Sequence, residues 1–125
     1  YYSYLMKTKI YIWQESYMAA RLLLRSLLEF AVNYQMYYLE IQVRMLEAII
    51  DYREEQSCWQ EKLTEALELG RKTRFIRVFA DEGEAVYEPL SALTDRRDEW
   101  KKDPYIREVM SACRAQMLIY PGYLR

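Results

Sequence analysis

The chain has 125 residues, of which 52% are hydrophobic and 30% are charged, a globular composition that excludes a disordered chain. Its formal net charge of −1 gives no general attraction to nucleic acid or to an anionic membrane. No apolar run approaches the roughly 20 residues that span a bilayer, and no signal peptide is visible, so we expect no membrane partner and a cytoplasmic location.

Glycine and proline are scarce, with three residues each, which favours long helices over strands and tight turns. The two cysteines, Cys58 and Cys113, fall inside helical patterns, so we expect buried, reduced thiols. Two cysteines without any histidine do not make a structural zinc site, and we expect no metal and no cofactor.

The first half of the chain predicts two consecutive helices. A partial helical spacing covers residues 3–14. The second helix starts near Ser16, a suitable N-cap residue. Its inner face is formed by apolar residues at steps of four, three and four, namely Ala20, Leu24, Leu27 and Ala31.

The third segment, residues 36–54, begins with an alternation that is also typical of a strand. A helix is the better interpretation, because the segment is too long for an ordinary strand. Two apolar stripes run along it, one of Leu39, Val43, Leu46 and Ile50, the other of Tyr38, Ile41, Met45, Ile49 and Tyr52. Apolar residues on two faces predict a helix packed between two neighbours.

The fourth helix is expected over residues 58–72. Ser57 and Gln60 have the spacing of a capping box. Its predicted inner face consists of Trp59, Leu63, Ala66 and Leu67.

Shorter elements are expected after residue 74. A short helix ends at Gly83, and another runs over residues 84–93, where Pro89 should kink or shorten it. Residues 95–103 are strongly charged and indicate a solvated connection. Asp103 and Pro104 then begin the last helix, which we expect to end at Pro121.

The second and fourth segments align with a shift of 39 residues, which places Tyr11, Ala20, Leu24 and Leu27 on Ile50, Trp59, Leu63 and Ala66. Each unit is therefore expected to be a pair of antiparallel helices that buries its faces by stacking on the next pair. We expect one all-α domain over residues 1–125, with hairpins at 1–34 and 35–73, short helices at 75–95 and a C-terminal helix at 103–120.

This spacing resembles the tetratricopeptide repeat, although Thr8 and Glu47 stand where that family prefers a small residue and Trp59 stands where it has alanine. The resemblance implies hairpins stacked in a short right-handed superhelix. It also implies that the first helix of each pair lines a concave binding face. Ligand- or partner-binding residues would then be Lys9, Ile12, Arg44, Ala48 and Asp51.

The stretch Phe75-Ile76-Arg77-Val78-Phe79-Ala80 followed by Asp81-Glu82-Gly83-Glu84 resembles the end of the helical region in MalT-like regulators of the LuxR family. In that family the region receives an inducer or a protein partner, and it controls self-association. The resemblance implies a regulatory segment that lacks the ATP-binding and helix-turn-helix domains and binds no nucleic acid itself. A tetratricopeptide-type adaptor with no role in transcription is the alternative.

Three other groups of residues have simpler interpretations than a functional site. The acids Asp81, Glu82 and Glu84 are expected to be solvated at a helix stop, because no histidine supports a metal site or acid–base chemistry. We therefore expect no enzyme. The tyrosines, Trp13 and the methionines, among them Met6 and Met18, are expected to be packing residues.

Overall fold

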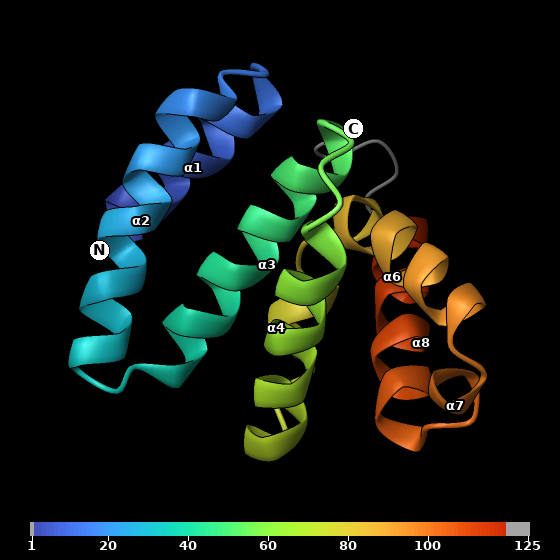
Figure 1. Ribbon diagram of the computed structural model, residues 1–125. Coiled ribbons are helices and arrows are strands. Elements are labelled where there is room, and N and C mark those ends of the chain that lie inside the picture. Colours follow the sequence, from blue (N-terminus) through green and yellow to red (C-terminus); the bar gives the residue numbers. More distant parts are fainter. Residues whose placement is uncertain (1, 120–125) are drawn as a thin grey trace.

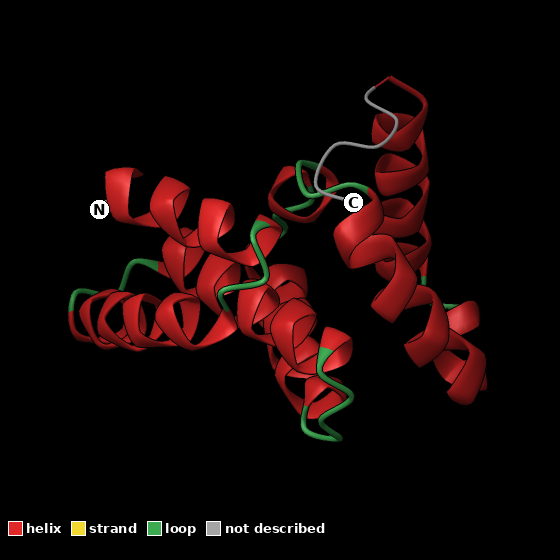
Figure 2. Cartoon of the chain, turned by 90° about the horizontal axis from the view of Figure 1, so that it is seen from above, coloured by secondary structure: helices red, strands yellow, loops and turns green. Residues whose placement is uncertain are grey.

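The computed structural model describes residues 2–119, which form eight helices and no strand, so the predicted all-α fold is confirmed for this part of the chain. The helices are α1 (Tyr2–Trp13), α2 (Tyr17–Asn33), α3 (Tyr37–Arg53), α4 (Trp59–Thr73), α5 (Arg77–Ala80), α6 (Glu84–Arg96), α7 (Asp98–Lys101) and α8 (Pro104–Ile119). Helix α1 packs against α2, α2 against α3 and α3 against α4, and α6, α7 and α8 form a second group beside them (Figures 1 and 2). None of these helices is long and apolar enough to cross a membrane.

The predicted helices agree with the observed ones in the first half of the chain and need correction in the second. Pro89 does not shorten α6, which continues to Arg96 with the proline buried inside it. The expected solvated connection over 95–103 contains the short helix α7, whose Trp100 is buried. The predicted end of the last helix at Pro121 lies outside the described residues.

The three capping predictions differ in outcome. Asp103 does cap α8, since its Oδ1 accepts hydrogen bonds from the backbone N–H of Tyr105 at 2.9 Å and of Ile106 at 3.3 Å. The capping box before α4 is wrong, because the N-cap residue is Cys58 and no side chain caps that helix. Ser16 occupies the N-cap of α2, also without a side-chain hydrogen bond.

The two second helices bury the faces that their spacing predicts. All four residues of the α2 face and all four of the α4 face are buried. On α4, the buried Gly70 continues the face by one more turn. The outer side of α4 is mostly polar, whereas α2 also exposes the apolar side chains of Met18, Leu22, Phe30 and Val32.

Helix α3 is the most deeply buried element, as its two apolar stripes predict. Nine of its residues are buried: Leu39, Ile41, Val43, Met45, Leu46, Ala48, Ile49, Ile50 and Asp51. It contacts α2, α4, α5 and α6, and in Figure 1 it lies between the α1–α2 hairpin and the later helices. Buried residues from α1 to α8 join in a single hydrophobic cluster around it.

The first four helices all end in the same way, with a left-handed residue that is not glycine. These residues are Glu15, Gln35, Glu55 and Arg74, with φ between 53° and 62°. In each turn the next residue donates its N–H to the carbonyl five positions back, as from Met36 to Ala31 at 2.8 Å. The left-handed residue itself donates to the carbonyl three positions back, as from Gln35 to Val32 at 3.3 Å. This pair of bonds is the Schellman motif, which satisfies carbonyls at the helix end.

The turns also fix how the two hairpins correspond. Gln35 matches Arg74, so the second helices are related by the predicted shift of 39 residues. Glu15 matches Glu55, however, so the first helices are related by a shift one residue longer. In this register Thr8 corresponds to Ala48, a small buried residue, and not to Glu47. The right-handed superhelical arrangement of the hairpins stays a prediction.

Helix α8 is held against the end of α4 at a glycine. A Cβ atom on Gly70 would overlap the hydroxyl group of Tyr105 and lie 2.8 Å from Cε2 of Phe79. The Tyr105 hydroxyl donates a hydrogen bond of 2.5 Å to the carbonyl of Phe75, and Arg71 forms an ion pair with Asp103. Gly70 is therefore needed for close approach and not for its backbone conformation.

We expect Gln35→Gly to stabilise the protein by about 0.5–1 kcal/mol, because a left-handed backbone costs a side-chain-bearing residue about 1–2 kcal/mol. Urea unfolding followed by circular dichroism measures the difference. The matched control is Glu29→Gly, in the exposed interior of α2, which should cost about 1 kcal/mol. Destabilisation by both variants would contradict the assignment of the turn.

We expect Gly70→Ala to destabilise the protein by about 1–3 kcal/mol through overpacking, although the same change in an open helix stabilises by about 1 kcal/mol. Equilibrium unfolding of the single and double variants with Tyr105→Phe measures the coupling. The alanine should cost less when Tyr105→Phe is also present, since the overlapping hydroxyl is gone. An equal cost with and without Tyr105→Phe would contradict the proposed contact.

Candidate functional site

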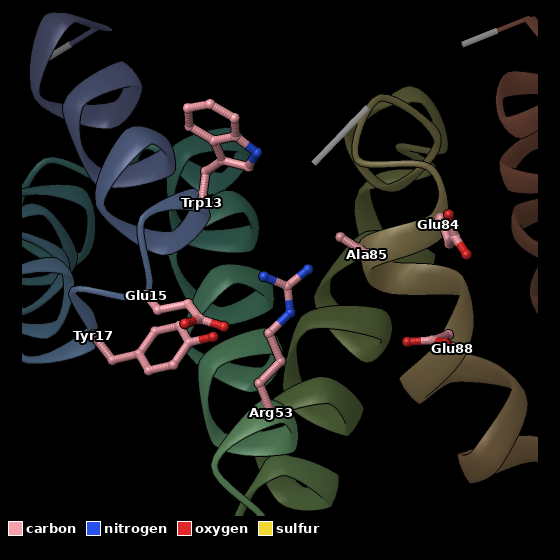
Figure 3. A pocket seen from close by; sticks show the side chains of 7 residues that line it. All are labelled: Trp13, Glu15, Tyr17, Arg53, Glu84, Ala85 and Glu88. Carbon is pink, nitrogen blue, oxygen red and sulfur yellow. The ribbon is translucent and has the colours of Figure 1, made fainter. Parts of the chain in front are cut away.

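A groove opens between the first hairpin and α6, above the end of α3. It encloses about 480 Å³ and is lined by Trp13, Glu15, Tyr17, Arg53, Glu84, Ala85 and Glu88. Figure 3 shows that the turn between α1 and α2 forms one wall and α6 the other. The Arg53 side chain extends from α3 into the space between the two walls (Figure 3).

Next to the groove, an ion pair joins α1 to the turn before α6. Lys9 Nζ lies 2.6 Å from Glu82 Oε1, and the Glu82 side chain is 3% exposed. The second carboxylate oxygen, Oε2, is buried and has no hydrogen-bond partner among the described residues. Lys9, Ile12 and Glu82 line a small cavity with Arg53 and Ala85, which also line the groove.

Of the five residues that the sequence predicts to line a binding face, the structure brings two to this region. Lys9 and Ile12 lie in the small cavity next to the groove. The α3 residues that share it with them are Leu46, Ile49 and Arg53. The predicted α3 residues belong to other faces of that helix, because the predicted alignment is one residue out of register for the first helices.

Arg44 and Ala48 therefore do not line the groove. Ala48 is fully buried. Arg44 binds the carboxylates of Glu40 at 2.9 Å and of Glu65 at 2.7 Å, the second of which lies on α4. Arg44 thus connects the two helices of the second hairpin.

Asp51 is the centre of a buried charge cluster and is 1% exposed. Its Oδ1 lies 2.6 Å from Nη1 of Arg21 on α2, and its Oδ2 lies 2.7 Å from Nζ of Lys62 on α4. Arg21 also contacts Glu54 at 2.5 Å, and the thiol of Cys58 donates to Asp51 Oδ2 at 3.2 Å. One carboxylate therefore ties three consecutive helices together, so Asp51 is a structural residue and not a groove residue.

The cluster changes the ionisation of its members. Burial opposes the Asp51 charge, but hydrogen bonds from Lys62, Arg21 and Cys58 outweigh it and lower the Asp51 pKa. The pKa of Cys58 is raised, chiefly because its thiol hydrogen-bonds to Asp51. Cys58 is exposed, which corrects the prediction of two buried thiols, but it is held protonated. Cys113 is buried as predicted, and burial raises its pKa to about 12.

The acids after α5 are not uniformly solvated, which corrects the expectation from the sequence. Asp81 is exposed and pairs with Arg77 at 3.0 Å, whereas Glu82 is buried against Lys9. Within residues 2–119, no three histidine, cysteine, aspartate or glutamate side chains are grouped closely enough to hold a metal ion. The groove instead presents carboxylates, a guanidinium and aromatic rings, which are groups suited to recognition.

Most residues of the groove lie outside the set of binding residues predicted from the sequence. The sequence predicts a packing role for Trp13, but this residue is 61% exposed at the groove wall. Glu15 and Arg53 are absent from the predicted binding residues, although the sequence contains a pattern that could have pointed to them. Trp13-Gln14-Glu15 and Arg53-Glu54-Glu55 are equivalent helix ends, and aligning them places Trp13 and Arg53 at the same position in the two hairpins.

The chain matches no protein-family model, no curated protein and no solved structure.

We expect Asp51→Asn to cost about 2–3 kcal/mol at neutral pH, because it weakens charge-assisted hydrogen bonds at a buried site. Since the folded pKa of Asp51 is below its unfolded value of about 3.9, its contribution is complete above that pH and is lost as pH falls further. Urea unfolding at pH 7 and pH 3 measures this. Glu61→Gln, on the exposed face of α4, is the control. A difference between Asp51→Asn and the wild type that is the same at both pH values would refute the role assigned to the carboxylate.

Proposed function

We propose that the chain is a recognition domain in which the groove between the α1–α2 turn and α6 binds an effector or a segment of a protein partner. The observation that carries this proposal is the composition of the groove walls. Trp13 and Tyr17 offer flat surfaces, and Glu15, Glu88 and Arg53 offer charges that fix orientation. Binding sites commonly combine aromatic surface with a few charged groups in this way.

The two walls belong to different groups of helices, which supports a regulatory role. The first wall belongs to the α1–α2 hairpin, and the second wall belongs to α6, which packs on α8. The Lys9–Glu82 ion pair connects the two sides. A ligand that contacts both walls favours one spacing between them, which shifts the population of conformations.

In the setting that the sequence resemblance suggests, this domain is the regulatory segment of a LuxR-type transcriptional regulator and controls its self-association. A simple adaptor for a protein partner is the second candidate. It is favoured by the open form of the groove, which gives a peptide segment access to it. A reading frame with an ATP-binding domain upstream and a helix-turn-helix downstream would favour the regulator.

A thermal-shift screen against sugars, nucleotides, small metabolites and peptides tests the proposal, because a ligand that binds the folded state raises its melting temperature. We expect a hit to lose most of its effect in Trp13→Ala and in Glu88→Gln. Tyr34→Ala, an exposed aromatic outside the groove, and Glu61→Gln are the matched controls. Sedimentation with and without the hit then reports self-association.

A ligand whose shift is unaffected by both groove variants would bind elsewhere and would refute the groove assignment. A peptide hit without any change in sedimentation would favour the adaptor over the regulator.

A further inference from the structure

Helix α1 carries an apolar stripe that no helix among residues 2–119 covers. Its members are spaced along one face at steps of four, four and three: Tyr2, Met6, Ile10 and Trp13. Their exposed fractions are 70%, 40%, 49% and 61%. A helix of a folded domain usually turns such a stripe towards a neighbour.

The second hairpin shows what covers this stripe when a neighbour is present. In the register fixed by Glu15 and Glu55, Met6 corresponds to Leu46 and Ile10 to Ile50. Leu46 is 2% exposed and Ile50 is fully buried. The preceding hairpin packs against α3 through α2, and Leu46 also faces Lys9 and Ile12 of α1 across the small cavity.

The opposite edge of α1, to which Tyr4 belongs, borders a second apolar feature. A cavity of about 450 Å³ between α1 and α2 is lined by Tyr4, Leu23, Ser26, Leu27 and Phe30. In the second hairpin, Tyr4 corresponds to Arg44 and Ser26 to Glu65, which form an ion pair across the equivalent crevice. The first hairpin therefore has an apolar cavity at the position where an ion pair closes the second hairpin.

We propose that the exposed stripe of α1 forms a docking face for another helical hairpin of the same kind, which precedes α1 in the polypeptide. Its second helix would cover α1 as α2 covers α3, with small and branched apolar residues at the spacing of the α2 face. Lys7 lies on this exposed side of α1, so an acidic residue is expected opposite it.

A second copy of the chain fits this face less well. The stripe of α2 that covers α3 is formed by Ala20, Leu24, Leu27 and Ala31, and it is buried in its own molecule. Another copy therefore offers no face of this kind without unfolding part of its core, because the apolar side chains that it exposes, such as those of its own α1 stripe, are mostly large. Trp13 belongs to both the stripe and the groove wall, but the proposal does not depend on the groove function, because it is tested at Ile10, which does not line the groove.

Thiol reactivity of an Ile10→Cys variant tests the proposal. The background carries Cys58→Ser, because Cys58 is exposed, and keeps the buried Cys113. The maleimide reaction rate is compared between the 125-residue chain and the natural polypeptide extended upstream by at least the length of one hairpin, about 40 residues. We expect the thiol to react at least tenfold more slowly in the extended polypeptide.

Glu61→Cys, on the exposed side of α4, is the matched control and should react at the same rate in both polypeptides. Equal rates at residue 10 in the two polypeptides would overturn the proposal. So would protection of residue 10 in the 125-residue chain that increases with its concentration, together with a doubled mass in sedimentation. That outcome would assign the face to a second copy.

Discussion

The apolar side chains of α3 are removed from water by contacts with four other helices, α2, α4, α5 and α6. A fully buried leucine or isoleucine side chain contributes about 1.5–3 kcal/mol relative to an exposed one, and α3 supplies more such residues than any other helix. Helices α2, α4, α5 and α6 each cover one part of the α3 surface. The position of α3 also determines the groove, whose Arg53 is the last residue of that helix.

One charged residue, Asp51, is buried in this core where α2, α3 and α4 meet. Asp51 would be very unfavourable in an apolar interior if it were alone. Arg21 and Lys62 approach it from the two neighbouring helices, so the carboxylate is satisfied only when both hairpins are in register. An ion pair of this type adds little to stability compared with apolar packing, but it penalises alternative arrangements of the helices.

The sequence was sufficient to predict the first four helices, because the periodicity of residues such as Ala20, Leu24 and Leu63 depends only on local spacing. The register between the two hairpins was harder to predict, because it is set by the left-handed residues Glu15 and Glu55. Glutamate has no special preference for that conformation, so the residue type did not reveal where these turns lie. A shift of one residue turns a side chain by about 100° around a helix, which explains why Ala48 and Asp51 were placed on the wrong face.

The linear order of contacts has a consequence for cooperativity. Helix α1 packs mainly on α2, whereas α3 is held from several sides. In an array in which each element touches only its neighbours, the outermost element opens with the smallest free energy. The first hairpin can therefore unfold locally while the centre of the molecule stays folded. One wall of the groove then belongs to the least protected part of the molecule, so capture of a ligand there is coupled to local ordering and reported by slower amide exchange in α1.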